Sequence, residues 1–228
     1  HVTDNVVMNS LILKTVYDLR IKHFIFPSCT VMYHSSKKPL SEKDFNESLE
    51  LNENYFGVGS TKVYLEKMCK FFSKFNKTKF TVIRHSNIYG PFDKYNLHNS
   101  HMFGATITKV LNNNDKITIW GSGKERRDLL YVSDLINFIQ KAITRQKNYY
   151  ELFNVGFGKD YSVINVVKKI IKESGLKLII EHDLTKPNIP TYLSLNCSKA
   201  NKKLGWKPKV NLEQGIKKTI IWYKKNYK

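Results

Sequence analysis

The chain has 228 residues, of which 41% are hydrophobic and 13% aromatic, so it can bury a substantial core in one large domain or two closely packed ones. No apolar run approaches the ~20 residues that a membrane-spanning helix needs, which predicts no membrane segment. The three cysteines, Cys29, Cys69 and Cys197, lie far apart without C-x-x-C spacing. We therefore expect no disulfide framework, no metal site and a reducing, cytoplasmic environment.

The formal net charge of +19 is large enough to attract anionic partners. The lysines are scattered through all the predicted elements rather than gathered in one run, and no zinc-finger, RRM or KH signature is present. We therefore favour a lysine-rich surface that attracts a small phosphate-bearing ligand. Nucleic-acid binding is kept as an alternative, which a steep salt dependence of affinity would reveal.

Hydrophobic spacing predicts alternating helices and strands in the first part of the chain. Residues 4–18 have the three-to-four periodicity of an amphipathic helix, and 22–28 are typical of a strand buried on both faces. A polar loop over 35–54 precedes a second helix at 58–75 and a second buried strand at 80–83. This alternation predicts a doubly wound α/β sheet.

The pattern after residue 87 is less regular but still mixes helices with strands. The predicted elements are a helix at 101–111, strands at 117–120 and 129–132, a helix at 133–142, a strand at 153–155, a helix at 163–174, a strand at 178–181 and a helix at 212–223. No internal repeat or low-complexity linker separates them, so we expect the two parts of the chain to pack against each other.

Ligands of doubly wound sheets bind beyond the carboxyl ends of the parallel strands. Here those ends are Ser28-Cys29-Thr30 and Arg84-His85-Ser86-Asn87, and we expect the ligand site there. The segment Gly-Val-Gly-Ser-Thr-Lys at 57–62 fails the Walker pattern, and no G-x-G-x-x-G follows a predicted strand. The sequence therefore shows no loop for a dinucleotide pyrophosphate.

Six segments occur in a characteristic order from one end of the chain to the other. They are FIFPSCTVMY at 24–33, GSTK at 59–62, NIYGP at 87–91, WGSG at 120–123, RDLLYVSD at 127–134 and LGWKP at 204–208. In order and spacing the set resembles the landmarks of the extended short-chain dehydrogenase/reductase (NAD-dependent epimerase/dehydratase) family. Within that family the motifs are most similar to those of the GDP-fucose synthases.

The resemblance implies a Rossmann-type sheet that is N-terminally incomplete, because the first βαβ portion of the family, with its glycine loop, has no counterpart here. Residues 1–87 would form the second part of the NAD(P)-binding domain, and 88–228 mainly a smaller substrate lobe, with about 128–146 returning to the first domain. Because the sequence does not begin with methionine, we expect it to start inside a longer protein. The implied cofactor is NAD or NADP.

The implied activity is hydride transfer at a hexose carbon of a nucleotide sugar, with a GDP-sugar favoured, by an epimerase, reductase or dehydratase. The resemblance and the strand-end placement together give the expected site. Catalytic roles are expected of Lys62, His101, Cys29 and Thr30; cofactor contacts of Lys62, Ser28, Arg84 and His85; and substrate contacts of Asn87, Asn99, Trp120 and Arg127. An imidazole exchanges protons near neutral pH, and a guanidinium grips phosphate.

Several of these residues have a plainer structural alternative. His101 could be a histidine at a helix N-terminus without a chemical role, and Cys29 a small buried hydrophobic residue. Trp120 could be a core aromatic residue, and Arg127 could form a surface ion pair with Asp128. Lys62 could be a solvated lysine on its helix.

Two departures from the family put the proton transfer in question. The family places a tyrosine four residues before the helical lysine, and here that position is Val58, which carries no transferable proton. The usual serine or threonine four residues before Tyr33 is Cys29. Either another group carries the proton, with Tyr55, Cys29 and His101 as candidates, or the chain catalyses a reaction where another acid suffices, or it is a binding-only relative.

The resemblance also implies a partner. The helices at about 4–18 and 58–75 correspond to those that pair across a homodimer in the family. Val7, Leu11, Tyr64 and Met68 are the expected contacts of that interface.

Overall fold

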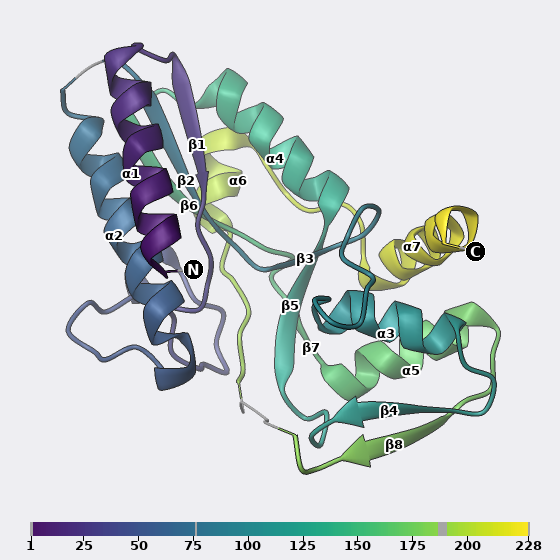
Figure 1. Ribbon diagram of the computed structural model, residues 1–228. Coiled ribbons are helices and arrows are strands. Elements are labelled where there is room, and N and C mark those ends of the chain that lie inside the picture. The colour runs from purple at the N-terminus through teal and green to yellow at the C-terminus, as the bar shows by residue number, and fades with distance from the viewer. Residues whose placement is uncertain (1, 76, 187–190, 228) are drawn as a thin grey trace.

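The computed structural model describes residues 2–75, 77–186 and 191–227 and arranges them in two lobes (Figure 1). The first lobe is built on a parallel sheet with strand order β1–β2–β6. Its strands are β1 (His23–Pro27), β2 (Lys79–His85) and β6 (Tyr150–Val155). In the register, Phe26 is level with Val82, which is level with Leu152. Val82 is fully buried, as expected for the central strand of a sheet covered on both faces.

Helices cover both faces of this sheet (Figure 1). On one face lie α1 (Val2–Asp18) and α2 (Phe56–Phe72), and on the other α4 (Val132–Arg145) and α6 (Ser198–Leu204). Leu13 and Leu65 pack with Phe80 on the first face. Phe138 and Trp206 pack on the second. This arrangement confirms the predicted doubly wound α/β class, and β1 is an edge strand that pairs only with β2 among the described residues.

The second lobe combines two small sheets with three helices. Its elements are β3 (Asn87–Tyr89), α3 (Met102–Leu111), β4 (Lys116–Trp120), β5 (Arg126–Tyr131), β7 (Asp160–Ser162), α5 (Val163–Ser174), β8 (Ile179–Asp183) and α7 (Leu212–Asn226). The order β3–β5–β7 is parallel and then antiparallel, and β4 pairs with β8 in parallel.

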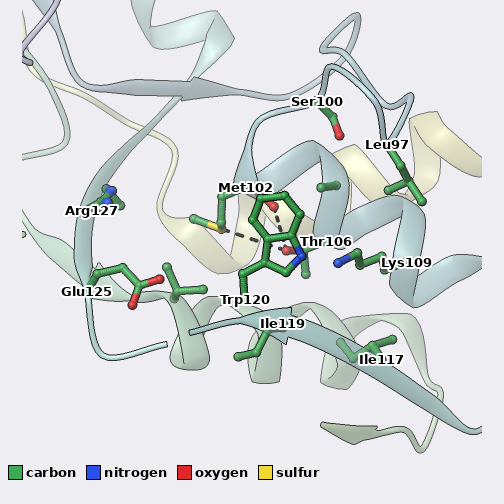
Figure 2. A pocket seen from close by; sticks show the side chains of 12 residues that line it. Leu97, Ser100, Met102, Thr106, Lys109, Ile117, Ile119, Trp120, Glu125 and Arg127 are labelled. Carbon is green, nitrogen blue, oxygen red and sulfur yellow. Dashed lines mark hydrogen bonds between the residues drawn. The ribbon is translucent and has the colours of Figure 1, made fainter. Parts of the chain in front are cut away.

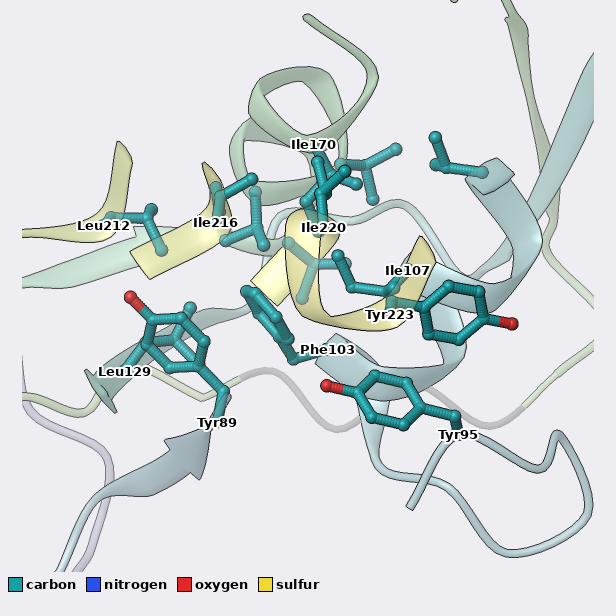
Figure 3. Packing of buried hydrophobic residues seen from close by; sticks show 14 of the residues in the cluster. Tyr89, Tyr95, Phe103, Ile107, Leu129, Ile170, Leu212, Ile216, Ile220 and Tyr223 are labelled. Carbon is teal, nitrogen blue, oxygen red and sulfur yellow. The ribbon is translucent and has the colours of Figure 1, made fainter. Parts of the chain in front are cut away.

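An aromatic and aliphatic core fills this lobe (Figure 3). The rings of Tyr89 and Phe103 lie 4.2 Å apart between centroids, and Ile107 on α3 and Ile216 on α7 are fully buried beside them. This core joins β3, at the end of the first sheet, to α3 and α7. It thereby holds the second lobe beside the carboxyl ends of β1 and β2.

Local signals explain where the long helices of this lobe begin and end. The side chain of Ser162 accepts a hydrogen bond from the Asn165 backbone at the start of α5, and Gly175 ends the helix with φ 78°. Asn211 and Gln214 form a reciprocal capping box at the start of α7.

Short elements differ from the sequence prediction. Three elements were not predicted: β3, β7 and α6, which have three, three and seven residues. Such lengths are too short to show a period. The predicted loop at 35–54 contains the 3-10 turn η1 (Glu42–Asp44), and η2 (Glu53–Tyr55) leads into α2. The division of the chain at residue 87 stays a prediction.

Candidate functional site

Polar residues from two neighbouring strand ends meet in a cleft of about 590 Å³, which we call the strand-end cleft. Cys29 and Thr30 follow β1, and His85 closes β2 and leads to Asn87. His101 and Arg127 reach the same cleft from the second lobe. The structure thus brings together six of the residues predicted for the site: Cys29, Thr30, His85, Asn87, His101 and Arg127.

A second pocket of about 400 Å³ lies between α3 and β4, and we call it the tryptophan pocket (Figure 2). Its lining is mainly apolar, including Met102, Ile117 and Ile119, with the indole of Trp120, whose residue is 59% exposed. Trp120 is therefore not a core aromatic. Arg127 lines this pocket as well as the strand-end cleft, so this residue stands where the two meet.

The surroundings of Arg127 leave its charge available. Its Nη1 donates to the Arg126 carbonyl oxygen at 3.2 Å, and within the described ranges it pairs with no carboxylate. Arg126 turns to the other side of the strand and pairs with Asp160 at 2.9 Å. The surface ion pair between Arg127 and Asp128, considered as an alternative, does not form.

Asp128 fixes the backbone beside Arg127. Its buried carboxylate accepts hydrogen bonds from the backbone N–H groups of Phe157 (2.8 Å), Gly158 (3.0 Å) and Leu195 (3.1 Å). Burial raises the pKa of Asp128 to about 6, although these N–H groups oppose the shift. One carboxylate therefore ties β5 to two other segments of the chain.

Lys62 and Val58 lie one turn apart on α2, near the end of β1. The Nζ of Lys62 donates to the carbonyl oxygen of Pro27 at 2.9 Å and lies 4.8 Å from the centre of the Phe26 ring. Val58 is 44% exposed and offers only methyl groups at the position of the family's tyrosine. The fold therefore places the lysine beside the strand end without the phenol that would normally accompany it.

Cys29 and His85 line the strand-end cleft in their neutral forms at neutral pH. Burial raises the pKa of the Cys29 thiol, and the Val31 backbone and nearby Lys62 only partly oppose this. Burial, together with the charge of Lys62, lowers the pKa of His85. The Nδ1 of His85 lies 2.8 Å from the Ser86 carbonyl oxygen, which assigns the proton to Nδ1 and leaves Nε2 as an acceptor.

Tyr55 stands near the same cleft. It lines a small pocket of about 140 Å³ together with Thr30, Asn87 and Arg127, three residues that also line the strand-end cleft. Tyr55 is the last residue of η2, just before α2, and precedes Val58 by three residues in the sequence. Among the described tyrosines, Tyr55 is the nearest to Val58 in sequence, and it lines a pocket together with strand-end residues.

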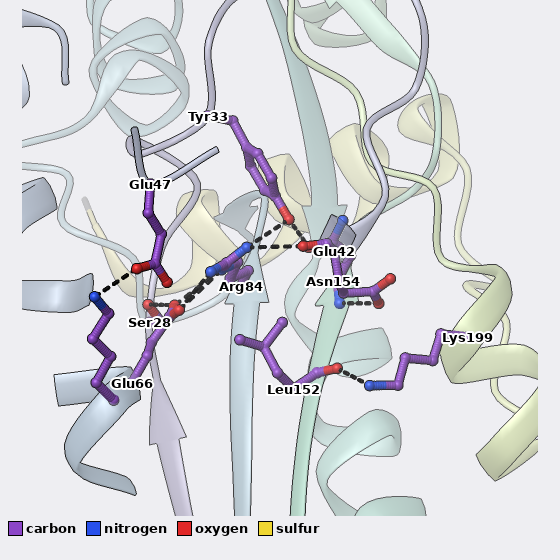
Figure 4. Close-up of polar contacts among 10 residues, drawn as sticks. Ser28, Tyr33, Glu42, Glu47, Glu66, Arg84, Leu152, Asn154 and Lys199 are labelled. Atoms are coloured by element: carbon purple, nitrogen blue, oxygen red, sulfur yellow. Dashed lines mark hydrogen bonds and ion pairs between the residues drawn. The ribbon is translucent and has the colours of Figure 1, made fainter. Parts of the chain in front are cut away.

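Two predicted cofactor residues, Ser28 and Arg84, bond to Glu66 (Figure 4) and line neither pocket. Ser28 is 1% exposed and donates to Glu66 at 2.6 Å. The guanidinium of Arg84 forms a buried ion pair with Glu66 and donates to the Tyr33 hydroxyl at 3.1 Å. Glu66 on α2 holds both side chains, and the contact of Ser28 and Arg84 with the cofactor stays a prediction.

Asn99 and His101, two further predicted site residues, precede α3 in the second lobe. Asn99 is exposed and lines neither pocket. His101 is the N-cap residue of α3, without a side-chain capping bond. Sequence reasoning missed Asp93 in the cleft and Glu125 in the tryptophan pocket, each with a buried carboxylate oxygen that has no partner among the described residues. In sequence both are ordinary loop residues, and no signal marked them.

Among the described residues, no group of three or more His, Cys, Asp or Glu side chains is placed to hold a metal ion. No helix within the described ranges is long and apolar enough to cross a membrane.

Comparisons with known proteins identify similar chains. The family model "NAD dependent epimerase/dehydratase family" matches residues 1–156. GDP-L-colitose synthase of Yersinia pseudotuberculosis is 28% identical over 225 residues, covering 96% of this chain and 73% of that protein. The dTDP-D-glucose 4,6-dehydratase of Mus musculus is 28% identical over 236 residues, covering 98% of this chain and 61% of that protein.

Among solved structures, the UDP-glucose 4-epimerase of Thermotoga maritima with UDP-glucose superposes with a TM-score of 0.87 at 25% identity, covering 100% of this chain and 71% of that one. These relatives agree with the resemblance that the six sequence segments predict, and the match of the family model covers well over half of the chain. The chain belongs to the NAD dependent epimerase/dehydratase family.

Proposed function

We propose that this chain forms the substrate side of an NAD(P)-dependent enzyme that epimerises, reduces or dehydrates a nucleotide sugar. The observation that carries the proposal is the place of Arg127, which has no carboxylate partner among the described residues and lines both the polar strand-end cleft and the apolar tryptophan pocket. A guanidinium binds phosphate oxygens through two parallel hydrogen bonds. A nucleotide sugar has the same order of parts, with a diphosphate between a polar sugar and a flat base.

In this proposal the hexose occupies the strand-end cleft and the nucleoside occupies the tryptophan pocket. Asn87, Thr30 and His101 offer donors and acceptors for sugar hydroxyls. The exposed indole of Trp120 offers a flat apolar surface to a base. The high positive charge of the chain favours a diphosphate ligand. A GDP-sugar and a role like that of the GDP-fucose synthases are the more specific proposal, supported by the relatives named for GDP-sugars.

The residues beside β1 fit the nicotinamide end of NAD or NADP. The Lys62 amine uses one donor on the Pro27 carbonyl, which leaves two N–H donors for ribose hydroxyls. His85 and Thr30 stand at the same edge of the sheet. NAD(P) would supply the hydride chemistry when bound.

For the proton, we propose His101 with Thr30 rather than Cys29. The raised pKa of Cys29 keeps its thiol protonated, which makes it a poor base. His101 lines the cleft from the second lobe, and histidine is the side chain that most often acts as a general acid or base. Tyr55 is the further candidate because its pocket shares Thr30 and Asn87 with the cleft.

A second candidate function is a binding protein without turnover. Val58 favours it, since an isopropyl group replaces the acid of the family. Both functions need the same substrate site, so binding and turnover must be measured separately. We further propose a homodimer through α1 and α2 and a cytoplasmic location, in which the three free cysteines would stay reduced.

Calorimetric titration with GDP, UDP and NADPH tests the proposal directly. It should be run on this chain and, if the gene encodes residues upstream of His1, on the longer protein. Binding of a nucleoside diphosphate, lost in Arg127→Ala, is expected for both functions. Oxidation of NADPH in the presence of a 4-keto nucleotide sugar would select a reductase, and conversion of a nucleotide sugar with NAD added would select an epimerase or dehydratase. If no nucleotide binds, both functions fail.

A further inference from the structure

The tryptophan pocket holds a carboxylate that the fold itself does not use. Glu125 lines this pocket, and its Oε2 is buried without a hydrogen-bond partner among the described residues. The Oγ of Ser100, in the same pocket, is also buried and has no hydrogen-bond partner in the described part of the chain. A buried acceptor without a donor is costly in a native fold, and in a pocket it indicates a ligand that brings the donor.

The backbone fixes the direction of Glu125. Its carbonyl oxygen accepts from the Val163 N–H at 3.0 Å, and the next residue, Arg126, pairs with Asp160 away from the pocket. Side chains alternate along an extended segment, so Glu125 and Arg127 share one side. Both line the tryptophan pocket, and Figure 2 shows them at the same end of it, with Lys109 at the other.

The chemistry of a carboxylate restricts what it can meet here. An ionised carboxylate only accepts hydrogen bonds and repels phosphate, so Glu125 cannot hold the diphosphate. A nucleoside diphosphate offers two kinds of donor, the ribose hydroxyls and the N–H groups of the base. Residues two apart on an extended segment are about 7 Å apart, which places Glu125 one short step from a diphosphate held by Arg127. The ribose is the part attached directly to that diphosphate.

We propose that Glu125 accepts hydrogen bonds from the ribose hydroxyls and makes the site selective for ribonucleotide sugars over 2′-deoxyribonucleotide sugars. This inference rests on the proposed function, because it needs a diphosphate at Arg127. A carboxylate holds a ribose diol in the same way in dinucleotide sites. A site built to bond a hydroxyl discriminates strongly against the analogue that lacks it, because its own polar group is left unpaired.

The test compares GDP with 2′-deoxy-GDP by calorimetry, on the wild-type chain, on Glu125→Ala and on Glu125→Gln. The wild type should bind GDP at least about tenfold more tightly than 2′-deoxy-GDP, the effect of one hydrogen bond to a charged group. In Glu125→Ala this ratio of the two dissociation constants should fall to about one. The matched control is Glu173→Gln, an exposed residue of α5, which changes the net charge equally and should keep the wild-type ratio.

Each result decides a different point. Equal binding of the two nucleotides by the wild type overturns the inference and leaves the proposed nucleotide site standing. A ratio that survives in Glu125→Ala also overturns it and assigns the ribose to another group. Weaker GDP binding by Glu125→Ala with an unchanged ratio assigns the carboxylate to the base instead. No binding of either nucleotide by the wild type means that the proposed function itself has failed.

Discussion

The guanidinium of Arg84 and the carboxylate of Glu66 form an ion pair of 2.6 Å in which each side chain is 5% exposed. Ser28 donates to the same carboxylate, and Tyr33 accepts from the same guanidinium (Figure 4). The Tyr33 hydroxyl in turn donates to Asn154 on β6 at 2.8 Å. The network thus joins α2 to β2, β6 and the segment after β1, and residues beside the ends of β1 and β2 line the strand-end cleft.

We predict that Glu66→Gln destabilises the chain by about 3–5 kcal/mol, because removing one partner leaves the Arg84 charge buried without compensation. The measurement is the free energy of unfolding in urea. The matched control is Glu47→Gln, which removes the partner of Lys67 in an ion pair whose side chains are both 58% exposed. That change should cost less than about 1 kcal/mol. Equal costs for the two variants would contradict the prediction.

The strand-end cleft could be predicted from the sequence because the carboxyl ends of parallel strands meet at the same edge of a sheet, so the residues that follow them lie close together. Cys29 and Thr30, and likewise His85 and Asn87, follow from locating two buried strands. Arg84 could not be placed in this way, since its partner Glu66 lies 18 residues earlier on a helix whose rotation no local pattern gives. Glu125 was missed for a related reason: burial of its oxygen depends on the packing of α3, β4 and α5 around it.

We predict that the loss in free energy of unfolding caused by Asp128→Asn becomes smaller as pH rises. The folded-state pKa of about 6 lies above the ordinary value of 3.8, so between these values the folded protein keeps a proton that the unfolded chain has lost. The stability that protonated Asp128 contributes is therefore full below pH 4 and is lost as pH rises through 6.

Urea unfolding of the wild type and Asp128→Asn at pH 4.5 and pH 7 measures this effect. The difference in free energy of unfolding between the two proteins should be about 2 kcal/mol smaller at pH 7 than at pH 4.5, given ~1.4 kcal/mol per pKa unit. Asparagine does not titrate, so it reports the pH dependence of all the other groups. A difference that stays constant, or grows with pH, would show that the buried carboxylate is already ionised at pH 4.5.

We predict that Val58→Tyr raises turnover of the proposed substrate by about 10²–10⁴-fold, the usual contribution of a positioned acid or base. Residues four apart on a helix face the same side, so the new phenol would lie beside Lys62, whose charge favours the phenolate. The measurement is the rate of NADPH oxidation with a saturating 4-keto nucleotide sugar.

Two controls make this result specific. Ile136→Tyr places a tyrosine on α4, at a position that is 49% exposed, and should leave the rate unchanged. Val58→Tyr combined with Lys62→Met should lose the gain. A rate that does not respond to Val58→Tyr but drops in Tyr55→Phe would mean that Tyr55 already carries the proton.

We predict that the chain forms a homodimer through the paired helices α1 and α2. These helices lie side by side on the outside of the first sheet (Figure 1). They expose Val7 (53%), Leu11 (60%) and Tyr64 (40%), and apolar patches of this kind mark interfaces. Leu11→Glu would place a charge in the middle of the contact, where burying it unpaired costs several kcal/mol.

Sedimentation equilibrium should therefore show a dimer for the wild type and a monomer for Leu11→Glu. Ile221→Glu, at a 61% exposed position of α7 in the other lobe, should remain dimeric. A monomeric wild type, or a Leu11→Glu variant that folds and stays dimeric, would place the interface elsewhere or remove it.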